Sequence, residues 1–325
     1  MRVLSLGAYV LNATLATALL AGCGALRQAQ DALPSSGGEG EVAHGKSWML
    51  PEAKSEDLLY LADAGSPGGV SVYSFPKLKF VGTLYNGYRP FGECVDASRN
   101  VYIVYSDELV EYAHGGSTPV RTIANPVYDG YLWSCSIDAN TGNLAVTAPR
   151  YSFGGQVLVF KNASGAPVSY NVDGDTFPGY CTYDNHGDLL VLTYPVLGYY
   201  PEVLLQLAAG RTKFRAVHIA DKREVNWSGG IQWNNGRLVI AGSEDVIRFL
   251  FKPMRHRTVR KSSTPLPGSS DLRQFWIQDK WIVVPSIGSN SFNVYKYPSG
   301  AEVKTIVASG EPIAAVVSVA AADYR

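Results

Sequence analysis

The chain has 325 residues, and its 28 basic and 28 acidic side chains give a formal net charge of zero. This balance provides no overall attraction to nucleic acid, so we expect no nucleic-acid partner. From residue 57 onward the chain is rich in Val, Leu, Tyr and Gly and has no long helical period. This composition indicates an all-β fold of one large domain or two small ones.

The N-terminal segment has the features of an export signal. A short positive start at residues 1–2 is followed by an apolar run over residues 3–20 and by two small residues before Cys23. Residues 20–23 resemble the lipobox of bacterial lipoproteins, which implies cleavage before Cys23 and acylation of its thiol. The alternatives are a transmembrane anchor, or an ordinary signal peptide with a chance cysteine. The apolar run is near the lower limit for spanning a bilayer and lacks stop-transfer charges, which favours the lipoprotein.

A flexible tether is expected after Cys23. Residues 27–55 are rich in Gln, Ala, Ser, Gly and Glu, and such a segment buries too little apolar surface to offset its chain entropy. We therefore divide the chain into a signal peptide at residues 1–22, an acylated cysteine and linker at 23–55, and a folded domain at 56–325. The lipid anchor makes the membrane a partner and predicts a location in the cell envelope, at the outer membrane or the cell surface.

A hairpin pattern recurs along the folded part. Copies begin at Glu93, Cys135, Cys181, Ile231 and Phe275. Each copy reads as a strand, a tight turn rich in Asp, Asn or Gly, and a second strand, and further strand-like runs follow it. The period of about 40 to 50 residues is typical of four-stranded propeller blades.

The two ends of the folded part complement each other. Residues 58–61 match the second strand of a blade whose first strand is missing, while residues 312–319 match a first strand. The sequence therefore predicts a β-propeller of roughly six blades, closed by the C-terminal strand near residues 314–319. The alternative is a pair of β-sandwiches, which gives no reason for the repeat or for the final strand. We expect a monomer.

Part of the repeat resembles NHL-repeat-type propellers of secreted bacterial proteins. The resemblance rests on the Pro-x-Gly start at residues 90–92, the hairpin at 96–104 and the trailing strand at 117–123. At the level of architecture it extends to gluconolactonase-like propellers and covers nearly all of residues 57–319. Propellers of this pattern include scaffolds, ligand binders, lactonases and dehydrogenases, so the resemblance implies a fold and leaves the function open.

The loops that lead into the innermost strands are rich in aromatic and charged side chains. In a propeller these loops gather on one face around the axis, where such side chains suit ligands with flat faces and polar edges. We expect a non-enzymatic binding or scaffold module for an unknown protein or small molecule. The alternative is that the aromatic residues pack as wedges between blades and the charges are solvated. The candidate binding residues are Tyr88, Arg89, Asp129, Trp133, Phe177, Tyr180, Trp227 and Arg273.

The sequence contains no recognisable catalytic set, and we expect no cofactor or metal. It has no Gly-x-Ser-x-Gly motif and no Cys/His cluster with zinc spacing. The rival hypothesis is a lactonase-like hydrolase with a divalent ion on the axis, for which Glu93 and Asp129 are the first candidate ligands. The positions aligned with Glu93 hold Cys135, Cys181 and Ile231, which do not form an oxygen cage.

Cysteines beyond Cys23 are found at Cys94, Cys135 and Cys181, and this odd number leaves at least one thiol free within the monomer. Cys135 and Cys181 occupy equivalent places on neighbouring innermost strands. Either a disulfide between them or a pair of buried thiols fits the pattern.

A basic cluster falls at the predicted edge of the fifth blade. It suits contact with anionic lipid or polymer, or protection of the sheet edge from aggregation. Its residues are Lys252, Arg255, Arg257, Arg260 and Lys261.

Overall fold

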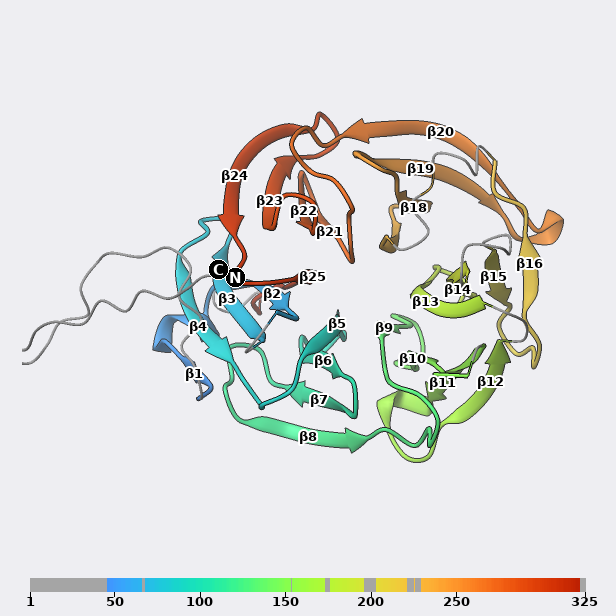
Figure 1. Ribbon diagram of the computed structural model, residues 1–325, viewed down its shortest axis with the longest axis horizontal. Helices are drawn as coiled ribbons and strands as arrows, with labels where there is room; N and C mark the ends of the chain where they lie inside the picture. The colour runs from blue at the N-terminus through green and yellow to red at the C-terminus, as the bar shows by residue number, and fades with distance from the viewer. Residues whose placement is uncertain are drawn as a thin grey trace, which may run out of the picture. The chain divides into compact units, whose positions relative to one another are not determined.

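The computed structural model describes residues 46–65, 68–152, 154–172, 176–195, 203–220, 225 and 229–321. Within this part, six antiparallel sheets are arranged in a ring around a central axis (Figure 1). The predicted signal peptide, Cys23 and Trp227 lie outside the described residues. In the same part of the chain, no helix has the length and apolar character needed to cross a membrane.

Blades 2 to 4 each contain four consecutive strands, ordered outward from the axis. Blade 2 contains β5 (Pro90–Val95), β6 (Val101–Tyr105), β7 (Glu108–Tyr112) and β8 (Pro119–Ala124). Blade 3 contains β9 (Ser134–Ile137), β10 (Leu144–Pro149), β11 (Gly155–Phe160) and β12 (Val168–Val172), with the short helix η2 (Lys161–Ala163). Blade 4 contains β13 (Thr176–Tyr183), β14 (Leu189–Pro195), β15 (Leu204–Leu207) and β16 (Arg215–Val217).

Blades 5 and 6 repeat the same order. Blade 5 contains β17 (Ile231–Asn234), β18 (Arg237–Ala241), β19 (Asp245–Lys252) and β20 (Arg257–Pro265), with η4 (Pro253–Arg255) in its outer turn. Blade 6 contains β21 (Trp276–Gln278), β22 (Trp281–Ser286), β23 (Ser291–Lys296) and β24 (Ala301–Val307).

Blade 1 joins the two ends of the chain. The C-terminal strand β25 (Pro312–Ser318) lies innermost and pairs antiparallel with β2 (Asp57–Asp63), with Leu59 opposite Val317. Outward follow β3 (Gly69–Phe75), β4 (Phe80–Leu84) and β1 (Trp48–Met49), and η1 (Pro51–Lys54) connects β1 to β2. The predicted count of six blades and the predicted closure by the C-terminal strand are therefore confirmed. The elements β1 and η1 belong to the segment assigned above to the linker.

A buried aspartate fastens this closure. The carboxylate of Asp63, at the end of β2, accepts backbone N–H groups from Ser309, Gly310 and Glu311 in the loop before β25, at 2.6 to 2.9 Å. It also accepts the Ser309 hydroxyl and the N–H of Gly65. Because these donors belong to opposite ends of the folded chain, one side chain ties the two ends together.

The second strand of each blade is mostly apolar because neighbouring blades cover both of its faces. Every residue of β6 is buried, and so is every residue of β10. The outermost strands β8 and β24 expose side chains along one face, because no sheet covers them there. The hydrophobic core is thus a series of interfaces between blades.

The repeated aspartates of the hairpins serve the turns. Asp138 Oδ1 accepts the backbone N–H of Asn140 at 3.0 Å, and Asp184 Oδ1 accepts that of His186 at 2.8 Å. In this way the side chain replaces a backbone acceptor within the turn. The recurrence of Asp in the sequence is therefore explained by the turn and needs no catalytic role.

The disulfide joins a different pair of cysteines from the pair considered in the sequence analysis, Cys135 and Cys181. Cys94 is bonded to Cys135, with Cα atoms 5.7 Å apart, and Cys181 is a buried free thiol. Equivalent residues of the innermost strands point in the same sense around the ring: Cys135 packs toward blade 2 and Cys181 toward blade 3. These two side chains therefore cannot meet. Cys94 is one residue further along its strand, points the opposite way and reaches Cys135.

Candidate functional site

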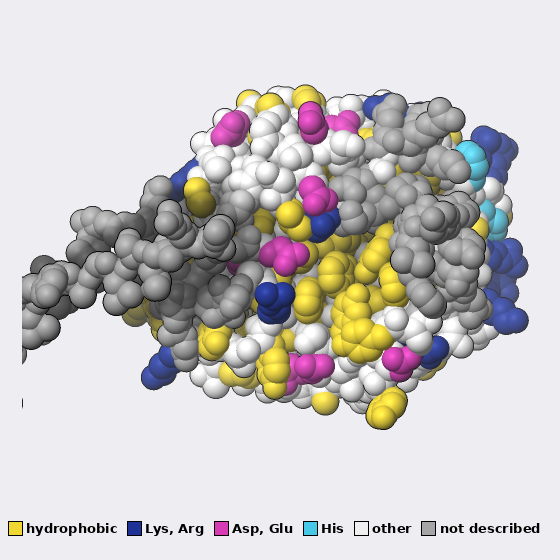
Figure 2. Space-filling model, viewed as in Figure 1, with side chains coloured by type: hydrophobic (Ala, Val, Ile, Leu, Met, Phe, Trp, Pro, Cys, Tyr) yellow, Lys and Arg dark blue, Asp and Glu magenta, His cyan; other side chains and the backbone are white. Residues whose placement is uncertain are grey.

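Seven aromatic side chains form one connected cluster on the face where loops enter the innermost strands, which we call the upper face. Trp133 lies at its centre, stacked on Phe91 with ring centroids 5.1 Å apart. Figure 2 shows hydrophobic side chains gathered near the middle of the ring, with acidic and basic side chains beside them. The aromatic cluster consists of Phe91, Tyr131, Trp133, Tyr151, Phe177, Tyr180 and Tyr194.

The backbone before β9 places the central residues of the cluster. Tyr131 and Trp133 donate their N–H groups to Pro149 and Thr147 of β10, at 3.1 and 2.9 Å, which extends the hairpin pairing beyond the strand. Gly92 permits the close approach of blades 2 and 3, since a Cβ at this residue would lie 2.6 Å from the Trp133 carbonyl oxygen. A glycine on β5 is thus required for Trp133 to sit where it does.

Charged side chains border the cluster on the side of blades 6 and 1. The Arg273 guanidinium pairs with Asp271, Nη1 to Oδ1, at 2.8 Å. Burial raises the pKa of the Tyr180 hydroxyl, and the nearby charge of Arg273 opposes this shift while that of Glu311 adds to it. The upper face therefore combines an aromatic wall with positive and negative groups close to the axis.

The structure brings some of the predicted binding residues together and leaves others apart. Trp133, Phe177 and Tyr180 belong to the aromatic cluster, and Arg273 lies beside Tyr180. Asp129 is exposed and accepts a hydrogen bond from the Ser152 hydroxyl.

Tyr88 and Arg89 are exposed on the loop before β5. Sequence reasoning did not select Phe91, Tyr131, Tyr151 or Tyr194, although aromatic residues in the same loops were the available signal.

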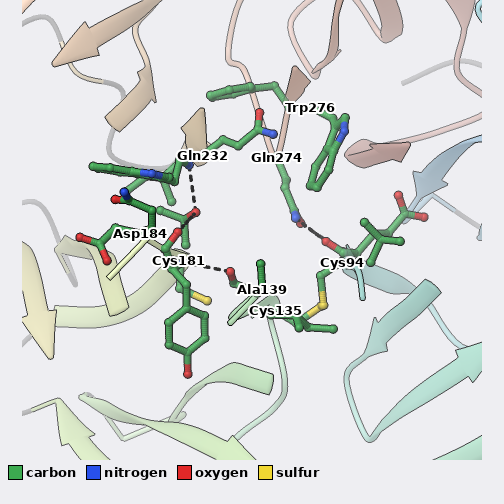
Figure 3. A pocket seen from close by; sticks show the side chains of 18 of the residues that line it. Cys94, Cys135, Ala139, Cys181, Asp184, Gln232, Gln274 and Trp276 are labelled. Carbon is green, nitrogen blue, oxygen red and sulfur yellow. Dashed lines mark hydrogen bonds between the residues drawn. A yellow bond between two sulfur atoms is a disulfide. The ribbon is translucent and has the colours of Figure 1, made fainter. Parts of the chain in front are cut away.

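A second opening lies on the lower face, which is formed by the turns between first and second strands. It is a pocket of 280 Å³ at the ends of the innermost strands of blades 2 to 6 (Figure 3). Gln232, Gln274 and Trp276 line it together with the disulfide. None of these three was selected from the sequence, although Gln232 and Trp276 occupy the repeat position of Cys94.

Several side chains that line this pocket form hydrogen bonds between blades. At the position of Cys94, blades 3 to 5 carry a polar side chain that bonds to the backbone of the next innermost strand, and Figure 3 shows two of these contacts as dashed lines. The pairs are Ser136 with Tyr183 at 3.1 Å, Thr182 with Trp233 at 3.0 Å, and Gln232 with Ile277 at 2.7 Å. Gln274 extends further and bonds to both backbone groups of Glu93. These polar groups are therefore engaged in holding the ring together.

Glu93 is buried away from solvent, and its donor set does not fit a divalent ion. Burial raises the pKa of its carboxyl group well above the ordinary value, which favours the protonated form. Burial likewise raises the pKa values of the Tyr60 and Tyr105 hydroxyls. Within the described ranges, no three His, Cys, Asp or Glu side chains converge. Asp129, the other candidate ligand, is exposed and bonded to Ser152.

Comparison with known proteins identifies the architecture. No protein-family model and no curated protein matches the sequence. A chain of the nidogen/laminin complex is similar in structure, with a TM-score of 0.64, 12% identity, and coverage of 81% of this chain and 98% of that one. A protein of unknown function from Bacteroides caccae has a TM-score of 0.58 at 12% identity, covering 81% and 99%.

A Bacteroides fragilis protein provisionally assigned as a 6-phosphogluconolactonase has a TM-score of 0.54 at 12% identity, covering 84% of this chain and 86% of that one. At such identities the likeness is one of fold, so the chain is a six-bladed β-propeller whose function must be argued from its own surface.

Proposed function

We propose that this chain is an exported, lipid-anchored propeller that acts as a non-enzymatic binding or scaffold module through the aromatic cluster of its upper face. The observation that carries the proposal is the cluster itself. Trp133, Tyr131 and Tyr194 are only partly buried although they lie next to the axis, and Tyr151 is 70% exposed. Exposed aromatic side chains beside an arginine are the groups that most often dominate protein interfaces.

An unsatisfied donor supports the same surface. The indole Nε1 of Trp133 is buried and has no hydrogen-bond partner among the described residues. Buried polar groups in native proteins are nearly always paired, so this N–H would pair with a ligand acceptor once the side chains that cover it shift on binding. Arg273 and Glu311 both act electrostatically on Tyr180, a member of the aromatic cluster, and offer charged groups to the polar edge of the same ligand.

The disulfide supports the export part of the proposal. Stable disulfides occur mainly in proteins of oxidising compartments, such as the periplasm and the cell surface. The Cys94–Cys135 bond is therefore in keeping with the export signal and with acylation at Cys23. The resemblance of the repeat to NHL-type propellers of secreted proteins points the same way. The nidogen/laminin structure is by name a complex of two proteins, which agrees with a binding role for this architecture.

The proposal is tested by capture from envelope extracts with the immobilised full-length protein. The test variant is Tyr131→Ala with Tyr151→Ala, which removes two rings 5.5 Å apart from the rim of the aromatic cluster. The matched control is Trp48→Ala with Phe80→Ala, which removes a ring pair 5.6 Å apart from the outside of blade 1. We expect partner recovery to fall by about tenfold in the first variant, which corresponds to a loss of about 1.4 kcal/mol of binding free energy for the two rings together. Equal recovery by the two variants would show that the binding surface lies elsewhere.

A further inference from the structure

A basic cleft lies on the rim of the ring, between the outer turns of blades 4 and 5. It has a volume of 670 Å³ and is lined from blade 4 by Arg211, Lys213 and Arg215. His256 of blade 5 completes the lining, together with His186 from the first turn of blade 4. Figure 2 shows Lys, Arg and His side chains gathered along this rim, beside the strands labelled β16 and β20 in Figure 1.

The two sides of the cleft are fixed to each other by backbone pairing. His218, just after β16, donates its N–H to the His256 carbonyl, and its own carbonyl accepts the N–H of Thr258, each at 2.8 Å. The outer edges of the two blades are thereby joined by a parallel bridge. The spacing between the blade 4 cations and His256 is consequently set by the fold and does not depend on mobile side chains alone.

A chain of buried polar side chains orients His256. The Asp188 carboxylate accepts a hydrogen bond from Gln206 Nε2 at 2.6 Å, which leaves Gln206 Oε1 to accept from His256 Nδ1 at 3.0 Å. The other ring nitrogen, Nε2, then lies 3.5 Å from the Arg215 guanidinium. Gln206 is 3% exposed, so this network lies beneath the cleft as a support.

Among the described residues that line the cleft, positive charge exceeds negative charge. Asp188 is the carboxylate in its lining, and it is buried, with its oxygens accepting from Gln206 and from the Ala209 N–H. Among the described residues, no carboxylate lies within ion-pair distance of Arg211, Lys213 or Arg215. The sequence predicted the basic residues of β20 and of the turn before it. It did not predict that blade 4 adds Arg211, Lys213 and Arg215 to the same rim.

From this geometry we propose that the cleft binds the phosphate group of a phosphorylated ligand. Arginine side chains hold phosphate through paired charge-assisted hydrogen bonds, and two of the three blade 4 cations are arginines. The volume falls within the range of about 300 to 1,000 Å³ typical of small-molecule pockets. Met254, 96% exposed at the edge of the cleft, provides an apolar contact for the carbon part of the ligand. The phosphate belongs either to a soluble ester or to a lipid headgroup.

The experiment uses the full-length protein and two probes. Titration calorimetry with sn-glycerol 3-phosphate tests a soluble ester. Sedimentation with vesicles containing phosphatidylglycerol tests a headgroup, with Cys23→Ser present in every protein so that no lipid anchor contributes. The test variant is Lys213→Ala with Arg215→Ala. The control is Arg237→Ala with Lys280→Ala, which removes the same two residue types from exposed positions outside the cleft. We expect the cleft variant to bind at least one probe about tenfold more weakly than wild type, and the control to bind as wild type does.

The pattern of losses identifies the source of the phosphate. A selective loss with glycerol 3-phosphate assigns the cleft to soluble esters, and a selective loss only with vesicles assigns it to headgroups. The proposal would be overturned if the cleft variant and its control bound each probe equally well, whether weakened or unchanged, or if wild type bound neither probe. The variant of the aromatic cluster should keep its phosphate affinity, so failure of this inference is distinct from failure of the proposed function.

Discussion

Removing the disulfide by Cys94→Ala with Cys135→Ala should lower the free energy of unfolding by about 4 kcal/mol. The bond closes a segment with a sequence separation of 41 residues. For a loop of this length, the chain-entropy model gives a stabilisation of about 4 kcal/mol, because the crosslink restricts the unfolded chain. The other junctions offer a comparison, since a hydrogen bond does the same task there. Ser136→Ala should therefore cost only about 1 kcal/mol.

Urea unfolding followed by tryptophan fluorescence measures this difference as a shift of the transition midpoint. Wild-type protein treated with a reductant should unfold at the midpoint of the double variant. Cys181→Ala is the control, since it removes the buried free thiol and keeps the crosslink. If oxidised wild type and the double variant unfold at the same urea concentration, the disulfide does not stabilise the ring and the reasoning is wrong.

Three further predictions concern closure, pH and address. Asp63→Ala leaves the donors of the 309–311 loop without their acceptor and should cost about 3 kcal/mol, and deletion from Pro312 onward should cost more; a truncated protein melting at the parent temperature would refute the closure. Because folding raises the pKa of Glu93, the contribution of this group to the free energy of unfolding is fully present below its unfolded pKa of about 4.5. The contribution is lost as pH rises toward the pKa in the folded protein, by up to about 1.4 kcal/mol per pH unit. Glu93→Gln should therefore gain stability over wild type as pH rises above about 4.5, and a gain independent of pH would contradict this. Cys23→Ser should release the protein from the membrane fraction, and unchanged fractionation would exclude the lipid anchor.

The six-bladed ring could be predicted because the hairpin pattern of one blade recurs along the sequence. Each hairpin must bury two faces against its neighbours, and this need produces the same apolar strand and the same Asp turn in successive blades. The closing strand was predictable for a related reason: a blade that lacks its first strand leaves an open edge, and residues 312–319 fit it.

The partner of Cys135 could not be predicted from alignment alone. Equivalent positions of the repeat point in one sense around the ring, so the correct partner was Cys94, one residue out of register. The same limit applied to the site. Loop composition indicated the upper face, but the choice of Phe91 and Tyr131 over Tyr88 depends on how each loop folds onto the axis. Only the blade 5 cations of this rim were predicted from the sequence, because the cleft joins turns of different blades that are distant along the chain.

Photo-crosslinking in living cells tests the central claim, binding through the aromatic cluster, most directly. A photoreactive p-benzoylphenylalanine would replace Tyr151 at the rim of the cluster, and in a second variant Val120, which is 58% exposed on the outer strand β8. Both sites are exposed, so neither replacement should disturb the core. We predict a discrete adduct from residue 151 and none from residue 120. An adduct from residue 120 alone, or identical adducts from both, would contradict binding through the aromatic cluster.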